Sequence, residues 1–212
     1  MERGLFIVFE GGEGAGKSTQ SDLLARWVDE QGRSVTRTRE PGGTPAAEAI
    51  REVLLDVANT GLDDRAEALL FAAARGDHAM RVIRPALERG DVVVCDRYLD
   101  SSVAYQGAGR GLGLDAVRDL SLWATRDLIP DLTIVLDLPV ETGLQRASER
   151  QGGEDRYETM DFGFHSRLRE GFLDIVRSDP QRCAIVDGTG SVDHVQAAIL
   201  GLVRNRLGAD VA

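Results

Sequence analysis

The amino-acid sequence predicts an α/β protein in which a five-stranded parallel sheet is covered by helices on both faces. Five short runs of apolar, often β-branched residues alternate along the chain with longer segments of helical composition. This alternation is typical of parallel strands joined by helical crossovers. The first run, Leu5–Phe9, is apolar at every position, as expected of a strand buried on both faces. The chain has 212 residues and no internal repeat, so we expect one domain over residues 1–212.

Each predicted element carries a local signal. The strands are short apolar runs bounded by glycine, proline or charged residues. After Leu5–Phe9 they are Ser34–Thr38, Asp91–Asp96, Leu132–Leu138 and Cys183–Asp187. The helices have apolar residues at spacings of three and four, or begin at a residue that can cap them. They are expected at Gln20–Gln31, Pro45 to about Val57, Asp64–Leu87, Asp115–Asp127, Val140–Glu149, Phe162–Arg177 and after Ser191.

Single residues mark several of these helix boundaries. Thr44 can cap a helix, and Pro45 suits the first helical position because its missing N–H would have no partner there. Asp64 followed by Glu67 is typical of a helix start. Pro85 should kink or interrupt the third helix, since it cannot donate a backbone hydrogen bond.

Composition and charge limit the classes of partner. Apolar residues make up 42% of the chain and charged residues 28%, as in ordinary globular proteins. The formal net charge of −10 argues against binding to nucleic acid or to an anionic membrane, because both require a positive surface. Small anionic substrates stay compatible with this charge, since an arginine cluster acts locally within about 10 Å.

Cellular location can also be predicted from the sequence. No apolar run approaches the ~20 residues that cross a bilayer, and the N-terminal residues lack the pattern of a secretory signal. Cys95 and Cys183 both lie in apolar strand-like runs. We therefore expect buried thiols in a reducing compartment, the cytoplasm.

A glycine-rich segment directly after the first strand carries the most specific single motif. Gly11-x-x-x-x-Gly16-Lys17-Ser18 has the spacing of a phosphate-binding loop, with a strand before it and a helix after it. Its glycines let backbone N–H groups turn toward an anion, and the helix N-terminus adds a partial positive charge. Lys17, the one lysine among 25 basic residues, would neutralise the β- and γ-phosphates. The expected ATP contacts are Gly11, Gly12, Glu13, Gly14, Ala15, Gly16, Lys17, Ser18 and Thr19.

Two oxygen ligands for Mg²⁺ are expected beside this loop. Ser18 occupies the motif position whose hydroxyl binds the metal. Asp96 ends the third strand, and the carboxyl ends of parallel strands meet at one edge of the sheet. Asp96 and Arg97 should therefore lie near the phosphate loop, where a carboxylate suits Mg²⁺. The alternative is an Asp96–Arg97 pair that caps the next helix.

Two further segments have compositions that suit the binding of a small polar molecule. Phe71 and Arg75 are four residues apart and share a helix face; the spacing alone favours Phe71 in the core and Arg75 on the surface. The segment Leu99–Gly113 carries polar side chains before a glycine-rich run. The expected substrate contacts in it are Ser101, Ser102, Tyr105 and Gln106.

The segment from about 147 to 157 has the composition of a mobile lid. Arg146, Arg150 and Arg156 flank the break Gly152-Gly153 between two helical segments. Such a lid can close over a triphosphate, exclude water and bring guanidinium groups to the transferred phosphoryl group. The alternative is a surface loop whose arginines pair with the neighbouring carboxylates.

Several motifs occur in a fixed order over nearly the whole chain. They are Phe9–Thr19, Thr38-Arg-Glu-Pro-Gly-Gly-Thr44, Leu70-Phe-Ala-Ala-Ala-Arg75, Asp96-Arg-Tyr98, Ser101–Gly107 and Glu154-Asp-Arg156. Together they resemble the thymidylate kinase family. The resemblance implies a P-loop NTPase-type fold, a homodimer, and Mg²⁺-assisted transfer of the ATP γ-phosphoryl group to thymidine monophosphate (dTMP), which gives the diphosphate (dTDP).

The resemblance also implies how the acceptor nucleoside is held. Glu13 would bind the 3′-hydroxyl of dTMP. Phe71 would stack on thymine, and Arg75 would bond to a base oxygen, so the resemblance reverses the surface position that spacing favours for Arg75. Tyr105 would crowd the 2′ side of the sugar and so disfavour ribonucleotides.

Further arginines are implied to bind phosphate and adenine. Arg39 and Arg97 would hold the acceptor phosphate, and Arg146 would lie against adenine. Because the acceptor is already an oxyanion at neutral pH, catalysis needs alignment and charge neutralisation more than a general base. Lys17, Arg97 and the lid arginines would supply the positive charge.

The position of the catalytic arginine differs within the family, which carries it either in the phosphate loop or in the lid. The loop interior Gly12–Ala15 contains no arginine, so the chain resembles the lid type found in bacteria. Arg150 and Arg156 are both candidates.

The phosphate loop raises two other hypotheses. One is a kinase of another small acceptor, such as a deoxynucleoside or a different nucleoside monophosphate. The other is a GTP-dependent switch, which would need an Asn-Lys-x-Asp motif. The chain cannot hold that motif, because its one lysine is Lys17.

Overall fold

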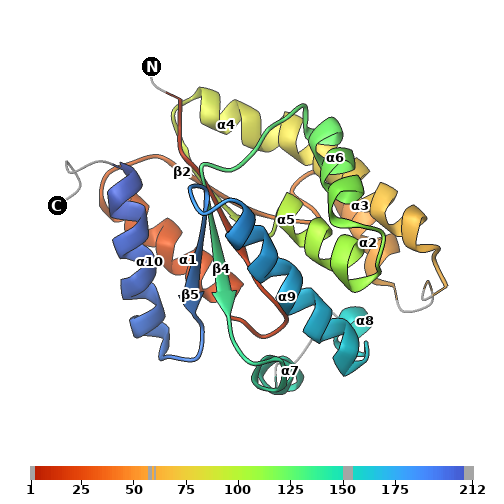
Figure 1. Cartoon of the computed structure of the whole chain (residues 1–212). Coiled ribbons are helices and arrows are strands. Elements are labelled where there is room, and N and C mark those ends of the chain that lie inside the picture. Colours follow the sequence, from red (N-terminus) through yellow and green to blue (C-terminus); the bar gives the residue numbers. More distant parts are fainter. Residues whose placement is uncertain (1–2, 57–58, 60, 150–154, 208–212) are drawn as a thin grey trace.

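The computed structural model contains a five-stranded parallel sheet with helices packed on both faces (Figure 1). It describes residues 3–56, 59, 61–149 and 155–207. The strand order is β2-β3-β1-β4-β5, and all four pairings are parallel. The strands are β1 Phe6–Glu10, β2 Val35–Arg39, β3 Val92–Asp96, β4 Leu132–Asp137 and β5 Cys183–Asp187. The predicted fold class and the five predicted strands are confirmed.

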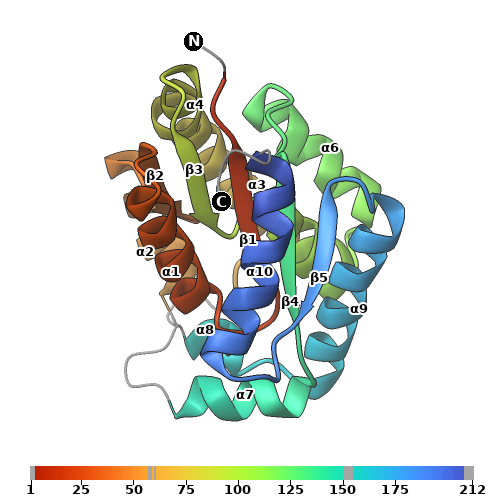
Figure 2. The same ribbon diagram turned by 90° about the vertical axis from the view of Figure 1, so that its left-hand side faces the viewer.

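The helices form a layer on each face of this sheet. They are α1 Lys17–Glu30, α2 Pro45–Leu55, α3 Asp64–His78, α4 Arg84–Glu88, α5 Leu99–Ser102, α6 Leu114–Thr125, α7 Val140–Ser148, α8 Asp155–Glu158, α9 Phe162–Ser178 and α10 Val192–Leu207. Helices α1 and α10 lie side by side on one face, whereas α3, α4 and α9 lie on the other (Figures 1 and 2).

The core follows from the two-residue period of the central strand. Ile7 and Phe9 pack against α1 and α10, and Phe6 and Val8 pack against the face that holds α4. All four side chains are fully buried, which explains why β1 is apolar at every position. Both cysteines are buried free thiols, as predicted. In the described part of the chain, no helix is both long enough and apolar enough to cross a membrane.

Helix boundaries agree with the capping signals, with one shift. The Thr44 side chain accepts a hydrogen bond from the Ala47 N–H, and Pro45 opens α2. The cap of α3 is Asp63, one residue before the predicted start, because its carboxylate accepts from two N–H groups of the first turn.

Two helical segments differ from the prediction. The helix expected to end at Leu87 has a π-helical turn at Ala79–Ile83, directly before α4 and Pro85. Pro85 lacks the N–H that an α-helix would pair with the carbonyl four residues earlier, so the α-helical pattern is interrupted before it and resumes in α4 with Pro85 in the first turn. The predicted interruption at Pro85 is confirmed. The polar segment after β3 is also helical, because α5 continues into a π-helical segment at Val103–Gly109. π-Helical turns are rare and recur at functional sites.

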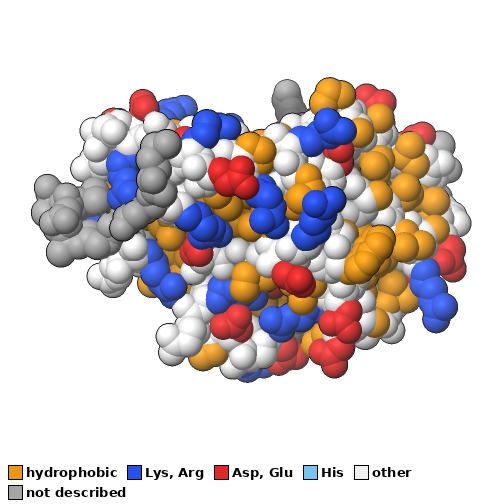
Figure 3. Space-filling model, turned by 90° about the horizontal axis from the view of Figure 1, so that it is seen from above, with side chains coloured by type: hydrophobic (Ala, Val, Ile, Leu, Met, Phe, Trp, Pro, Cys, Tyr) orange, Lys and Arg blue, Asp and Glu red, His pale blue; other side chains and the backbone are white. Residues whose placement is uncertain are grey.

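One side of the molecule exposes large apolar side chains. Trp123 of α6 is 82% exposed and Leu69 of α3 is 57% exposed. A shallow groove between these two helices is lined by both residues and by Leu120. Figure 3 shows hydrophobic side chains gathered toward the side on which α3 and α6 lie.

Candidate active site

The parallel register brings residues that are distant in sequence to one edge of the sheet. Asp96 at the end of β3 lies opposite Phe9 of β1 on one side and opposite Arg39 of β2 on the other. The phosphate loop starts one residue beyond Glu10, which ends β1. The expectation that Asp96 lies near the phosphate loop is therefore confirmed.

The phosphate loop needs its glycines for two separate reasons. Gly11, Gly14 and Gly16 have φ angles of 136°, 64° and 90°, which residues with side chains rarely adopt. The loop also packs closely on α7, since a Cβ on Gly14 would lie 2.1 Å from the carbonyl oxygen of Gly143. Helix α1 begins directly after Gly16, so its N-terminal N–H groups lie beside the loop, as an anion site requires.

Lys17 is a buried positive charge folded onto this loop. Its Nζ donates to the carbonyl oxygens of Gly12, at 2.7 Å, and Gly11, at 3.1 Å. Burial lowers the Lys17 pKa to about 8; Arg97 adds to the decrease, and Glu13 opposes it. An anion in the loop would stabilise the protonated ammonium, because opposite charge raises the pKa of a lysine.

Ser18 and Asp96 meet as the metal prediction requires. Ser18 Oγ donates to Asp96 Oδ2 over 2.5 Å. Two oxygen ligands suit Mg²⁺, which takes most of its other ligands from water and substrate phosphates. No group of three or more His, Cys, Asp or Glu residues in the described ranges could hold a metal, so phosphates would be needed to complete this site. The helix-cap alternative for Asp96 is wrong, because no side chain caps α5.

Arg97 and Glu13 connect the phosphate loop with the acceptor side. Arg97 Nη1 donates to the Gly11 carbonyl oxygen at 3.1 Å, and Nη2 donates to Glu13 Oε1 at 3.2 Å. The guanidinium carbon lies 5.0 Å from the centroid of the Tyr105 ring, and the Tyr105 hydroxyl donates to Glu13. Burial would raise the Glu13 pKa, but the charges of Arg97 and Lys17 hold it below its usual value of 4.5.

A hollow of about 420 Å³, partly open to solvent, lies next to this pair. Its apolar wall includes Leu55 and Tyr157 as well as predicted residues. Of the predicted acceptor contacts, it is lined by Glu13, Phe71, Arg75, Arg97, Ser101, Ser102, Tyr105 and Gln106. Arg39 does not line it: its guanidinium donates to Glu48 Oε2 at 3.1 Å.

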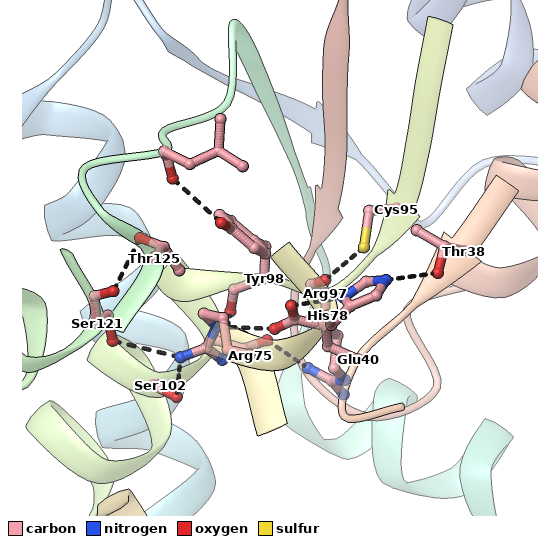
Figure 4. A network of polar contacts seen from close by, with 12 residues as sticks. Thr38, Glu40, Arg75, His78, Cys95, Arg97, Tyr98, Ser102, Ser121 and Thr125 are labelled. Atoms are coloured by element: carbon pink, nitrogen blue, oxygen red, sulfur yellow. Dashed lines mark hydrogen bonds and ion pairs between the residues drawn. The ribbon is translucent and has the colours of Figure 1, made fainter. Parts of the chain in front are cut away.

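Arg75 lines this hollow, and Figure 4 shows the network of polar contacts around it. The residue is 2% exposed, and its Nε donates to Glu40 Oε2 at 2.7 Å. Its Nη1 donates to Ser102 Oγ at 3.0 Å and to Ser121 Oγ at 3.3 Å. The surface position that the spacing favours is therefore wrong, because partners from distant segments compensate the buried charge. Phe71, one turn earlier, is half-buried.

Comparison with known proteins agrees with this geometry. A family model described as "Thymidylate kinase" matches residues 9–199. A thymidylate kinase of Caulobacter vibrioides is 50% identical over 208 residues, which cover 98% of this chain and 100% of the relative. One of Leifsonia xyli is 52% identical over 196 residues, 92% of each chain. The crystal structure of an Ehrlichia chaffeensis thymidylate kinase matches with a TM-score of 0.78 and 33% identity, covering 95% of this chain and 100% of that one.

The chain belongs to the thymidylate kinase family. The resemblance that its sequence motifs indicate is thereby confirmed, and so is a fold shared with a solved thymidylate kinase.

Arg146 of this thymidylate kinase family member lies beside the turn that follows β5. Its Nη1 donates to the Gly188 carbonyl oxygen at 2.9 Å. The same turn approaches the phosphate loop, since a Cβ on Gly188 would lie 3.6 Å from the Ala15 carbonyl oxygen. Arg146 is therefore placed next to the nucleotide loop.

Arg156 occupies a different environment from a free lid arginine. It is 4% exposed, its Nη2 pairs with Glu67 Oε2 at 2.5 Å, and its Nη1 donates to the Leu54 carbonyl oxygen. Glu67 also accepts from Gln106 Nε2 at 2.8 Å. Among the described side chains, the carboxylate partner of Arg156 is 89 residues away in the chain; Glu154 lies outside the described residues. Arg150 lies outside the described residues.

Three fully or almost fully buried glutamates support the site and are not among the residues that the sequence predicts for it. Glu10, Glu40 and Glu67 are 0%, 5% and 0% exposed. Their sequence signals are weak: Glu10 ends an apolar run, and Glu40 follows Arg39 inside a turn-rich motif. The position of Glu67 is typical of a helix start, where a first-turn glutamate is usually exposed.

Glu10 ties the central strand to the start of α5. Its Oε1 accepts from the backbone N–H groups of Tyr98, at 2.8 Å, and Ser101, at 3.0 Å; its Oε2 accepts from Ser101 Oγ at 2.5 Å. Burial raises the Glu10 pKa to about 7, and the charge of Asp100 adds to the increase. The hydrogen bonds and Arg97 oppose it.

Glu10→Gln should flatten the pH dependence of stability. The native carboxyl titrates near pH 7 and the unfolded one near 4.5, so the native state binds more protons between these values and loses stability as pH rises. A neutral amide of the same shape removes this titration. The free energy of unfolding is measured by urea unfolding for both proteins. The difference, wild type minus variant, should decrease by on the order of 2 kcal/mol between about pH 5 and about pH 8. Parallel profiles of the two proteins would contradict this role.

Proposed function

We propose that this enzyme transfers the γ-phosphoryl group of ATP to dTMP, giving dTDP and ADP. The observation that carries the proposal is the Arg97–Glu13 pair, which joins the phosphate loop to the acceptor hollow at one edge of the sheet. Nucleotides bound on the two sides of this pair would bring their phosphates together. The names of the relatives agree with this reaction.

The donor side would neutralise charge around the triphosphate. The loop N–H groups and the α1 N-terminus would hold the phosphate oxygens, and Lys17 would exchange its two carbonyl partners for the β- and γ-phosphates. Mg²⁺, when bound through Ser18 and Asp96, would supply further positive charge there. Arg146 would lie toward the adenosine.

The acceptor side would position dTMP without a general base, because its phosphate oxygen is already an anion. Phe71 would stack on the base, Arg75 would bond to a base oxygen, and Glu13 would accept from the 3′-hydroxyl. Tyr105 donates to Glu13, so its ring would lie against the sugar and disfavour a 2′-hydroxyl. The remaining contacts would come from Arg39, Arg97, Ser101, Ser102 and Gln106.

Lys17→Ala should abolish turnover without unfolding the protein. The variant loses the ammonium that neutralises the γ-phosphate, so kcat in a coupled assay of ADP formation with ATP, Mg²⁺ and dTMP should fall by about 10³-fold. Thermal unfolding should stay within a few degrees of wild type, because the buried charge of Lys17 is costly to the fold. A near-normal rate in the variant would refute the role of Lys17. The proposed acceptor would be refuted if the wild type formed no ADP with dTMP but did phosphorylate a deoxynucleoside or another monophosphate.

The segment from about 147 to 157 is proposed to close over the bound ATP as a lid on a single domain. It would deliver a catalytic arginine, either Arg150 or Arg156. The buried contact of Arg156 with Glu67 favours Arg150, because Arg156 would have to leave a fully buried carboxylate to reach a phosphate.

Arg150→Ala and Arg156→Ala should therefore separate chemistry from stability. Arg150→Ala should lower kcat by about 10³-fold at unchanged melting temperature. Arg156→Ala should lower the free energy of unfolding by roughly 3 kcal/mol, since it weakens the compensation of buried Glu67. Urea unfolding and steady-state kinetics on both variants provide the check. The reverse pattern would assign the catalytic role to Arg156.

A homodimer is the proposed assembly, with the exposed groove between α3 and α6 as its interface. Its support is the exposure of Trp123 and Leu69, since large apolar patches on a protein surface usually mark interfaces. The buried free thiols Cys95 and Cys183 support a cytoplasmic location, where thiols stay reduced.

Trp123→Glu should convert the dimer to a monomer. A carboxylate at the centre of an apolar interface would be desolvated without a partner, while the exposed position leaves the monomer fold unaffected. Sedimentation should show the wild type at twice the 23.0 kDa chain mass and the variant at the chain mass. A wild-type monomer, or a variant that stays dimeric, would rule out this interface.

A further inference from the structure

Glu40 is a buried carboxylate at the end of β2 whose two oxygens hold two side chains of α3. Its Oε2 accepts from Arg75 Nε at 2.7 Å, and its Oε1 contacts His78 Nδ1 at 2.9 Å. Figure 4 shows both α3 side chains converging on Glu40. Since Glu40 also lines the acceptor hollow, its contacts belong to the wall against which a base would lie.

His78 holds the Glu40 carboxylate on the side away from Arg75. The ring is fully buried between Glu40 and Thr38, whose Oγ1 lies 2.7 Å from Nε2. A carboxylate can only accept, so Nδ1 carries the proton and donates to Glu40, while Nε2 lies within hydrogen-bond distance of the Thr38 hydroxyl. Gly43 closes over the ring, where a Cβ would lie 2.5 Å from His78 Cδ2. Glu40 is thus held on its far side by a fully buried ring with no room for a side chain at Gly43.

Arg75 has almost all of its donors occupied. A guanidinium has five N–H groups, and four are used: one by Glu40, one each by Ser102 and Ser121, and one by the carbonyl oxygen of Tyr98 at 3.1 Å. The second N–H of Nη2 has no acceptor among the residues that the structure describes. Because Arg75 lines the hollow, this N–H is the one donor that it can offer to a ligand.

We propose that Glu40, held by His78, is the positioning residue that sets pyrimidine selectivity: it fixes Arg75 so that a single N–H meets a base oxygen. The inference rests on the proposed acceptor site. Thymine and uracil present a carbonyl oxygen at position 4, whereas cytosine presents an amino group there. A fixed N–H donor can bond to the carbonyl oxygen but faces another donor in the cytosine amino group. Both donors then stay unpaired in a buried site, which is costly.

The fixed geometry explains why discrimination depends on Glu40 and not on Arg75 alone. A long side chain with free rotamers could turn its donors away from a cytosine amino group and lose little. Here any rotation of the guanidinium breaks a charge-assisted hydrogen bond to a carboxylate that is itself clamped. Discrimination between thymine and cytosine therefore depends on Arg75 and Glu40 together.

The test is a double-mutant cycle on selectivity, defined as the ratio of kcat/KM for dTMP to kcat/KM for dCMP. Glu40→Gln should lower this ratio at least about 10-fold, mainly through a higher KM for dTMP, with kcat within a few-fold of wild type. In an Arg75→Ala background the same change should alter the ratio less than about 2-fold, because Glu40 acts through Arg75. His78→Phe, which removes the clamp and keeps the charges, should shift the ratio in the same direction.

Asp91→Asn is the matched control. Asp91 is another buried carboxylate, but it lies before β3 at the opposite end of the strand, where it accepts from Thr36 and Arg89 at 2.8 Å. Asp91→Asn should keep the selectivity ratio of wild type, whatever its effect on stability. This separates a loss of positioning from a general loosening of the fold.

Two results would overturn the proposal: an unchanged ratio in Glu40→Gln, or an equal shift in the presence and absence of Arg75. Should Glu40→Gln fail to fold, His78→Phe decides by the same criterion. A wild-type enzyme that does not phosphorylate dTMP would instead refute the proposed function, so the two failures are distinguishable.

Discussion

The hydrogen bonds of buried Glu10 are the contact on which the rest of the site depends. This carboxylate ends the central strand, where it accepts from the N–H groups of Tyr98 and Ser101 and from the Ser101 hydroxyl. It thereby takes the place of the side-chain cap that α5 lacks. Arg97 immediately precedes these residues and has a φ of 68°, a conformation that surrounding contacts must hold. Glu10 thus couples the strand that opens the phosphate loop to the residues that face the acceptor.

Opposite charges alternate between the phosphate loop and the neighbouring hollow. Lys17 and Arg97 approach from the donor side and from β3, and Glu13 lies between them and Tyr105. Each ionised group is buried, so each would be costly alone and is stabilised by its neighbours. A bound phosphate adds negative charge to this cluster, for which the two cations are already in place. Preorganised charge of this kind is the main means of catalysis in phosphoryl transfer.

Two buried arginine–glutamate pairs support the hollow, one in its wall and one behind Gln106. Arg75 pairs with Glu40 on one side, and Arg156 pairs with Glu67 on the other. Buried ion pairs contribute little net stability because desolvation opposes the attraction. Their effect here is orientation: one pair fixes the Arg75 guanidinium in the wall of the hollow, and the other links α8 through Glu67 to Gln106, which also lines the hollow.

The sequence by itself determined the five strands, the phosphate loop and the order of the family motifs, because each depends on apolar periodicity or glycine spacing within a few residues. Only the tertiary structure decided that Arg75 is buried, that Arg156 faces Glu67 and that the segment after β3 is helical. The partners that compensate these charges lie 35 and 89 residues away along the chain. A local pattern contains no information on such a partner, since an arginine on a helix face is compatible equally with water and with a distant carboxylate. Parallel pairing of the strands brings those partners together.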